Sequence, residues 1–401
     1  MAEQQILLSI VVPTRNRARY AISMIESILD LKGDVFELVV SDNSDDNTLA
    51  DWVTHQCNDP RLIYKRVTGA LSMTENHNHA FGMASGEFVC LIGDDDTVLP
   101  TILDGCRCAH QQKLDALTPG TTIRYCWPDL VHRYWGKRQA GKIYADRWEG
   151  QVWVGNPKRE AFACMRRAGQ GTAWLPKLYH GIVRRSLLEE LKAETGAYCF
   201  GVSPDVYMAM ALARKVIRQA CTDTPLTIPG SSGGSNSGRA AKREHKGDLK
   251  KDPHMVAFRD EIWPEGNPEF FSIETVWAQA ALEAVRRANW EEMLSVFNFP
   301  YLYAICFLRH SDYFHEIRRA ISVGALTRGR SRGLIWLSIA MQIARAFGAT
   351  SWYYIRRSIR PTPRGYSQEY GTYPDIRSAS EFVSTILGEK ASWKSAFTSL
   401  K

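Results

Sequence analysis

The chain has 401 residues, enough for one large domain or for two or three smaller ones, and 45% of them are hydrophobic, as in a soluble globular protein. Its nine cysteines form no CxxC pair and several lie inside apolar runs, so reduced cytosolic thiols fit better than disulfides or structural zinc. The net charge of +7 is uneven, because residues 309–364 hold eleven arginines against Asp312 and Glu316, which favours an anionic partner for that half.

The first ninety residues alternate apolar strands with helices. The expected strands are 6–12, where proline stops the run, 36–40, 62–65 and 88–92, and the expected helices between them are 18–31, 48–56 and 74–84. This alternation predicts a mainly parallel, doubly wound sheet. Ligands of such sheets bind beyond the carboxyl ends of the strands, where Arg15, Asp42 and the triplet Asp94–Asp96 all fall.

The aspartate triplet follows the apolar strand at 88–92 directly. Adjacent like charges repel one another and lose solvation when they are packed inward, so such a cluster is costly unless a cation or a hydrogen-bonding ligand shares the site. A divalent metal is the simplest explanation. The alternative is a solvated turn or a helix N-cap, since aspartate is common at both.

The pattern weakens from about residue 114 to residue 221, where helices are expected at 184–191 and 205–214. Residues 229–238 are all Pro, Gly, Ser or Asn, which predicts a flexible loop that packs no core and continues into the basic stretch 239–251. Beyond it, a second, all-helical region is expected, with helices at 273–287, 290–298, 301–309, 313–323 and 334–359.

Four motifs in order, VVPTRNR at 11–17, VVSDNS at 39–44, NHA…ASGEFV…GDDD at 78–96 and, more weakly, GVSPD at 201–205, resemble those of family-2 glycosyltransferases. The resemblance covers about residues 6–230. It implies an α/β fold, a Rossmann-like nucleotide-diphospho-sugar transferase (GT-A) domain, with a C-terminal mainly α-helical region. The expected parts are a catalytic domain at 1–230, a flexible loop at 231–252, a basic helical region at 253–365 and a C-terminal tail at 366–401.

The resemblance also implies roles for single residues. Pro13, Arg15 and Asn78 would border the nucleotide, Asp42 would accept a hydrogen bond from its base, Asp94 would contact the ribose, and Asp95 or Asp96, in the family's DXD position, would bind Mg²⁺ or Mn²⁺. These hard cations prefer oxygen ligands. A metal held there would neutralise charge on the departing nucleoside diphosphate, a Lewis-acid effect worth several kcal/mol in general.

Inversion at the sugar carbon needs one general base, for which the resemblance suggests Asp205. A helix N-terminus at Asp205 would favour its carboxylate form, although Ser-Pro-Asp is also an ordinary capping sequence. Asp42 likewise has a helix-capping alternative. His245 would complete the metal site or be an exposed loop histidine.

Five further residues have expected roles that rest only on their positions in the chain. Arg239, Lys242 and Arg243 would close over the diphosphate as a lid or remain solvated. His180 and Trp174 would line the acceptor side or serve in the core or on the surface.

The sequence therefore predicts an inverting, metal-dependent transferase that uses a nucleoside-diphosphate sugar, with UDP favoured, and a saccharide or lipid-linked acceptor in surface polysaccharide assembly. The alternative from another class is a non-catalytic saccharide- or membrane-binding component. A sugar-nucleotide pyrophosphorylase is disfavoured because the first loop lacks a glycine-rich phosphate cradle.

A cytoplasmic location is expected, because the N-terminus has no basic region followed by an apolar stretch. The stretch 334–354 carries Gln342 and Arg345 and reads poorly as a membrane span. The arginine-rich helices either bind the anionic inner face of the cell membrane or pack on protein. No nucleic-acid motif accompanies them.

Overall fold

A computed structural model of the protein describes residues 6–69, 71–235, 238–239, 246–249, 263–327, 329, 331–359, 362, 366–388 and 397. His245, Lys242 and Arg243 lie outside these residues. All nine cysteines are free thiols. Among the described residues, no helix combines the length and the apolarity that crossing a membrane requires.

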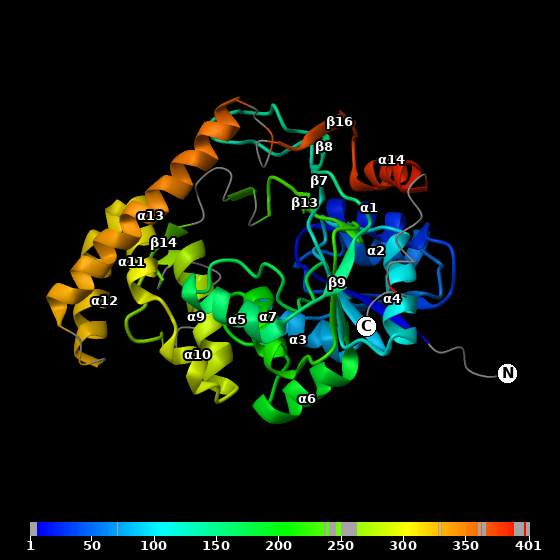
Figure 1. The fold of residues 1–401 in the computed structure, drawn as a ribbon. Coiled ribbons are helices and arrows are strands. Elements are labelled where there is room, and N and C mark those ends of the chain that lie inside the picture. The colour runs from blue at the N-terminus through cyan, green and yellow to red at the C-terminus, as the bar shows by residue number, and fades with distance from the viewer. Residues whose placement is uncertain are drawn as a thin grey trace.

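An eight-stranded sheet forms the centre of the N-terminal part (Figure 1). Its strands are β1 (Leu8–Thr14), β2 (Phe36–Asp42), β3 (Leu62–Arg66), β4 (Phe88–Leu91), β6 (Ala116–Pro119), β9 (Val152–Val154), β10 (Ile182–Arg184) and β11 (Gln219–Thr222). The order is β3-β2-β1-β4-β10-β6-β11-β9, in which the first four strands run parallel and β10 is antiparallel to both of its neighbours. The predicted α/β class is thereby confirmed.

Strand β1 runs through Pro13 instead of ending before it. Pro13 pairs with Ser41 of β2, whereas β4 pairs with β1 only as far as Val11, so no ladder partner on the β4 side requires an N–H from Pro13. The extra residues place Thr14 opposite Asp42 at the end of β2. The strand therefore reaches the edge of the sheet at which the polar clusters were expected.

Successive residues of β1 alternate between the two faces of the sheet, because side chains in a strand point to opposite sides. Ile10 and Val12 belong to the apolar core under α1 (Ala18–Leu29) and α4 (Thr101–Gln111), whereas Val11 belongs to the core on the other face. The remaining helices of this part are α2 (Thr48–Gln56), α3 (Met73–Gly82), α5 (Pro157–Arg166), α6 (Arg185–Thr195) and α7 (Pro204–Lys215).

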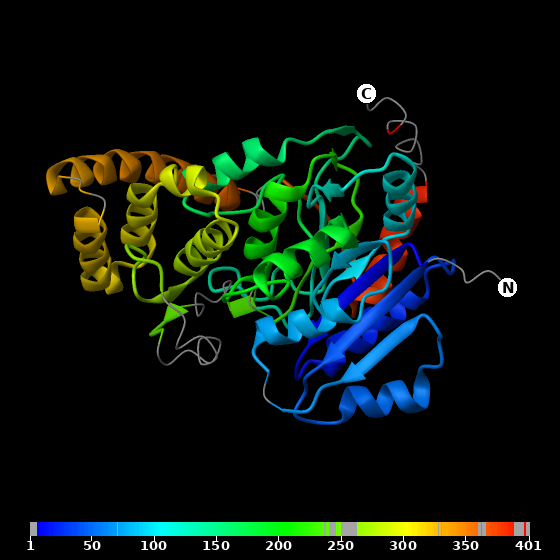
Figure 2. The ribbon, with the colours of Figure 1, turned by 90° about the horizontal axis from the view of Figure 1, so that it is seen from below.

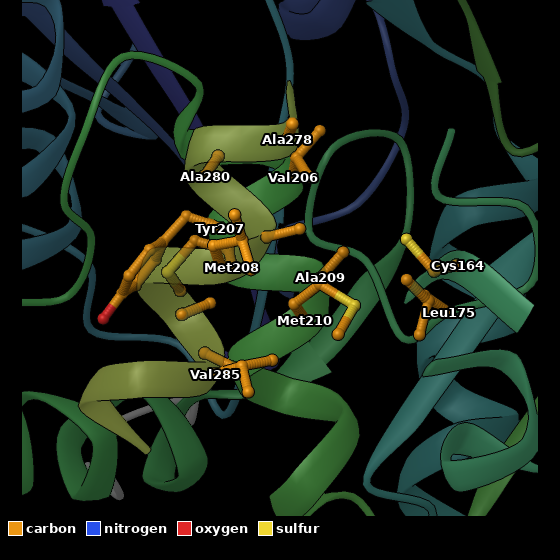
Figure 3. Packing of buried hydrophobic residues seen from close by; sticks show 14 of the residues in the cluster. Cys164, Leu175, Val206, Tyr207, Met208, Ala209, Met210, Ala278, Ala280 and Val285 are labelled. Carbon is orange, nitrogen blue, oxygen red and sulfur yellow. The ribbon is translucent and has the colours of Figure 1, made fainter. Parts of the chain in front are cut away.

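Helix α7 is buried on all sides, since every residue from 206 to 213 has little or no exposed surface. A helix that is apolar all round belongs in the centre of a protein. It packs against α9 (Ile273–Arg287), and Figure 3 shows its Tyr207 and Met208 beside Ala280 of that helix. One continuous apolar cluster thus joins the sheet to the helical region.

The predicted C-terminal helical region is present. It consists of α9, α10 (Glu291–Ser295), α11 (Phe299–Arg309), α12 (Phe314–Thr327) and α13 (Arg332–Ile359). Both views place α11, α12 and α13 to one side of the sheet (Figures 1 and 2).

A smaller sheet, in the order β13-β7-β8-β16, stands beside the large one. Its strands are β7 (Ile123–Cys126), β8 (Lys142–Ala145), β13 (Gly230–Ser231) and β16 (Gln368–Thr372). The segment read as a tail contributes β16 and α14 (Ile376–Gly388), and Arg377 of α14 donates to Asp30 over 2.7 Å at the end of α1. Strand β16 and helix α14 are therefore part of the α/β fold.

Two isoleucines test this account of the core. Ile10 of β1 has no exposed surface, whereas Ile217 is 86% exposed. We expect Ile10→Ala to lower the free energy of unfolding by about 2–5 kcal/mol, because it removes buried methyl groups and leaves a cavity. Ile217→Ala should change it by less than about 0.5 kcal/mol. Urea denaturation measures both, and equal losses in the two variants would contradict the assigned faces.

Candidate functional site

The carboxyl ends of three neighbouring strands meet at one edge of the large sheet. Thr14 ends β1 opposite Asp42, which ends β2. The Oγ1 atom of Thr14 donates a hydrogen bond of 2.6 Å to Oδ2 of Asp94, three residues beyond β4. Two of the expected polar clusters, those of Asp42 and of the aspartate triplet, are therefore linked through a single threonine.

The three aspartates are buried. Relative exposure is 6% for Asp94, 6% for Asp95 and 1% for Asp96. The next helix, α4, has Pro100 as its N-cap residue, so none of the three caps it. The burial rules out a solvated turn, and the N-cap at Pro100 rules out a helix cap. Three adjacent buried carboxylates therefore need partners that compensate their charge.

Arg17 supplies the main counter-charge. Its Nε donates to Oδ1 of Asp94 over 2.6 Å, and its terminal NH2 lies 3.0 Å from Oδ2 of Asp95. The guanidinium also lies over the ring of Tyr20, at 4.6 Å from the centroid. Planar guanidinium groups suit this two-carboxylate geometry, and removing one member of a buried pair leaves an uncompensated charge.

The Gly/Ser-rich segment supplies further donors. Ser232 has no exposed surface, and its N–H and Oγ donate to Oδ2 of Asp95 over 3.1 and 2.6 Å. The N–H of Gly230 donates to Oδ1 of Asp96 over 2.7 Å. A Cβ at Gly230 would stand 1.8 Å from the carbonyl oxygen of Asp95, so only glycine fits there. This part of the predicted flexible loop is packed, because buried carboxylates need its backbone donors.

Asp96 receives its remaining bonds from two other segments. Its Oδ2 accepts from the N–H of Gly93 over 2.7 Å and from the hydroxyl of Tyr179 over 2.9 Å. Nε2 of His180 lies 3.7 Å from the same oxygen, and Nδ1 of His180 is 3.0 Å from Oγ1 of Thr227. His180 has a positive φ of 68°, which is uncommon for a residue with a side chain and marks a locally strained position.

Burial dominates the protonation of this cluster. It raises the pKa of Asp94 to about 6, against the opposing charge of Arg17, and it raises the pKa of Asp96 to about 6. Burial and then the charge of Asp96 also raise the pKa of Asp95. Burial lowers the pKa of His180 to about 3, so that ring is neutral at pH 7.

One carboxylate oxygen of this cluster is left to bind a divalent cation. Both oxygens of Asp94, both of Asp96 and Oδ2 of Asp95 accept hydrogen bonds, whereas Oδ1 of Asp95 accepts none from the described residues. No group of three or more His, Cys, Asp or Glu in the described part of the chain is arranged to hold a metal ion. Magnesium can bind through one carboxylate if phosphate and water supply the other ligands, and Oδ1 of Asp95 is the atom of this cluster that would serve as that ligand.

Pro13, Arg15 and Asp42, three of the residues expected at the nucleotide, lie along the same edge. Asp42 has no exposed surface, and its carboxylate accepts from the N–H of Ser44 over 2.9 Å and from the hydroxyl of Tyr64 over 2.7 Å. It does not cap α2, whose N-cap residue is Asn47. Pro13 precedes Thr14 in β1, and Arg15 is exposed, with one guanidinium nitrogen 3.3 Å from Asp45.

The side chain of Asn78 bonds to the backbone of another segment of the protein. Its Oδ1 accepts from the N–H groups of Tyr198 and Cys199 over 2.9 and 3.0 Å, and its Nδ2 donates to the carbonyl of Cys199 over 2.9 Å. The short bond from Thr74 Oγ1 to the carbonyl of Gly201 ties down the same segment. Helix α3 therefore fixes the loop that leads into Asp205.

Asp205 stands in the first turn of α7 and is partly buried. Its N-cap residue, Ser203, makes no capping bond and instead donates to Oδ1 of Asp205 over 2.5 Å. Oδ2 of Asp205 accepts no hydrogen bond from the described residues. Burial first, and then the charges of Asp96, Asp95 and Asp205, raise the pKa of Tyr179, so Asp205 acts electrostatically on the residue that binds Asp96.

Trp174 and Arg239, whose roles were expected from their positions in the chain, lie in two further parts of the structure. Trp174 packs edge to face on Trp153 of β9, with the ring centroids 4.8 Å apart, and touches the position of Gly120 beyond β6. The backbone N–H of Arg239 donates to the carbonyl of Ser235, which places it next to the packed Gly/Ser segment. The metal role of His245 lies outside the described residues.

Sequence reasoning missed the residues that satisfy the carboxylates. Arg17 was noted only as part of a motif, although a buried acidic cluster next to a loop with two arginines is itself a signal for such a pair. Ser232 gave no signal, because serine in a Gly/Ser-rich run is typical of an exposed loop. Tyr179 and Thr14 carry no charge and were not singled out.

Comparison with known proteins agrees with the motifs. Residues 9–126 match the model of the family described as Glycosyl transferase family 2, which confirms the resemblance for this segment. It contains the elements from β1 to β7 and the aspartate cluster. The "Putative colanic acid biosynthesis glycosyl transferase WcaA" of Escherichia coli (strain K12) is 34% identical over 110 residues, which are 27% of this chain and 39% of that relative. The alignment thus spans well under half of the relative's length.

Two of the solved structures that match this chain are the following. S. aureus TarS 1-349 in complex with UDP-GlcNAc is 15% identical, with 81% of this chain and 92% of that chain covered and a TM-score of 0.46. The mannosyltransferase PcManGT from Pyrobaculum calidifontis in complex with GDP-Man and Mn²⁺ is 16% identical, with 87% and 83% covered and a TM-score of 0.38.

The raised pKa of Asp96 predicts a pH effect on stability. Its folded value of about 6 lies above the unfolded value of about 3.9, so between these the folded chain holds a proton that the unfolded chain has released. Stability from this group is therefore complete below about pH 4 and is lost as the pH rises through about 6. The free energy of unfolding of the wild type, minus that of Asp96→Asn, should fall by up to roughly 3 kcal/mol across this range in EDTA. A constant difference would contradict the assignment.

Proposed function

We propose that the chain is an inverting, metal-dependent glycosyltransferase that moves a sugar from a nucleoside-diphosphate donor, with UDP favoured, to a hydroxyl of a saccharide or lipid-linked acceptor. The observation that carries the proposal is the buried acidic edge at the ends of β1, β2 and β4, within a segment that matches family-2 glycosyl transferases. The E. coli relative has colanic acid biosynthesis in its name, which supports a role in glycan assembly.

The donor would lie across the ends of these strands. Asp42 and Asp94 sit on either side of Thr14, one for the base and one for the ribose in the proposed assignment. A buried carboxylate held by fixed donors is a rigid acceptor, so it orients a ligand N–H or hydroxyl without first having to order itself. Asp95 would hold a Mg²⁺ or Mn²⁺ ion through Oδ1, and that ion would supply charge neutralisation at the diphosphate.

Asp205 would act as the general base. Oδ2 of Asp205 would accept the proton of the acceptor hydroxyl while that oxygen forms a bond to the anomeric carbon. The bond from this carbon to the diphosphate oxygen breaks on the opposite face, and the electron pair leaves with the nucleoside diphosphate. Ser203 holds Oδ1 and so keeps the other oxygen in one direction. The neutral ring of His180 and the Trp174–Trp153 pair would shape the acceptor side.

Nucleotide release from a panel of activated sugars tests the reaction. We expect wild type to release nucleoside diphosphate with Mn²⁺ and an acceptor saccharide, and Asp205→Asn to be slower by about 10²–10⁴-fold, because an amide cannot take the proton. Calorimetric binding of the nucleoside diphosphate should be unchanged in this variant. Asp34→Asn, an exposed aspartate after α1, is the matched control and should keep full activity.

Three outcomes would contradict parts of the proposal. Equal release by Asp205→Asn and the wild type would reject Asp205 as the base. Equal release with Mn²⁺ and with a chelator would reject metal dependence. Nucleotide binding without turnover on any donor would favour the alternative, a non-catalytic saccharide- or membrane-binding component.

A further inference from the structure

Helix α13 exposes apolar side chains on one face in two groups, at 334–341 and at 352–359, which together form a stripe. Besides Phe347, which lies on another face, six large apolar side chains in it are between 51% and 75% exposed, namely Leu334, Leu337, Met341, Trp352, Ile355 and Ile359. Their spacing of three, four or eleven residues places them on one face of an α-helix. A helix of 28 residues is about 42 Å long, so the stripe is far larger than the scattered apolar residues of an ordinary surface.

The stripe is not the face by which α13 joins the protein. Ile335, Ile339 and Ala346 are buried on the other side and belong to the core cluster that includes α11. In Figures 1 and 2, α13 runs along the outer edge of the molecule. The helix therefore has two apolar faces, one of which is covered by this chain and one of which faces outward.

We infer that the exposed stripe of α13 docks on an anionic lipid bilayer, lying in the plane of the interface. Charge favours this occupant. Helix α13 contains arginine but no Asp or Glu, and Arg318 and Arg319 of the neighbouring α12 are exposed. An apolar face bordered by arginines is typical of helices that bury side chains among the acyl chains while their guanidinium groups meet lipid phosphates.

The position of Arg345 distinguishes between two possible occupants of the stripe, a lipid bilayer and a second copy of the chain. It is exposed, and it lies four residues after Met341 and seven before Trp352, hence within the stripe. Position 345 is also the middle of α13, so two copies paired through the stripe would set Arg345 against Arg345 in an apolar interface. Such burial of like charges is costly. At a lipid surface the same side chain can extend to a phosphate.

The C-terminal end of α13 contacts the smaller sheet, and that sheet provides a hydrogen-bond donor to the aspartates. Arg357 lies over the ring of Trp135, at 4.2 Å from its centroid, in the connection between β7 and β8. Strand β7 pairs with β13, whose Gly230 donates to Asp96. A docked α13 would therefore bring this edge of the protein to the membrane. Only this last consequence rests on the proposed function, in which the acceptor is lipid-linked.

Vesicle co-sedimentation of the full chain, without donor sugar, tests the docking. We expect the wild type to sediment with phosphatidylcholine vesicles that contain phosphatidylglycerol, and more weakly with phosphatidylcholine alone. Leu337→Gln with Met341→Gln should weaken both by roughly tenfold or more, because the stripe is interrupted. Arg345→Gln should weaken only binding to the anionic vesicles, by about fivefold. Ile217→Gln, which changes an apolar residue 86% exposed elsewhere, should bind as the wild type.

Binding that is absent, or that is indifferent to the anionic lipid and to the paired Gln substitutions, would overturn the inference. So would a wild-type dimer in sedimentation equilibrium that the paired substitutions dissociate, because a second copy would then cover the stripe. Thermal unfolding checks that the variants fold, as expected for exposed positions. Nucleotide release with a soluble acceptor fails or succeeds independently of these results.

Discussion

The structure depends on one constraint, which is that three adjacent carboxylates at the end of β4 are buried and must find partners. Arg17 provides the positive charge for Asp94 and Asp95, and Ser232 provides two donors for Asp95. These partners come from segments far apart in the sequence. The first loop, the aspartate loop and the Gly/Ser segment are therefore fixed relative to one another by the need to satisfy charge, because unpaired buried charges are very costly.

This arrangement suits a site that receives a charged ligand. Thr14, Arg17 and Ser232 make five contacts to Asp94 and Asp95, namely four hydrogen bonds and one ion pair, so the acidic edge is held in shape before a sugar donor arrives. The Arg17 guanidinium pairs with Oδ2 of Asp95, which leaves Oδ1 of this aspartate without a hydrogen bond from the described residues. In the proposed reaction, the metal ion would enter a place where one guanidinium faces three carboxylates, so that the remaining negative charge favours a cation.

The sequence was sufficient for the parts of this picture that depend on periodicity and on strand ends. It placed Asp42 and the aspartate triplet at one edge of a parallel sheet, because alternating strands and helices leave few other topologies. It failed where the outcome depends on long-range pairing. Ser232 and Gly230 look like loop residues until the carboxylates that need them are seen. Strand β16 has the sequence QEYGT, without the apolar run that marks the other short strands. The exposure of the α13 stripe could not be predicted for a similar reason, because apolar spacing identifies one face of a helix but not what covers that face.

The free energy of unfolding of Arg17→Met, compared with that of Arg19→Met, tests the central claim most directly. Arg17 pairs with the buried aspartates, whereas Arg19 is exposed and lies 6.0 Å from the centroid of the Tyr20 ring. Measured by urea denaturation at pH 7 in EDTA, Arg17→Met should lose about 3–5 kcal/mol, because it leaves buried carboxylates without their counter-charge. Arg19→Met should stay within about 0.5 kcal/mol of the wild type. Equal stability of the two variants would show that Arg17 does not hold the acidic cluster together.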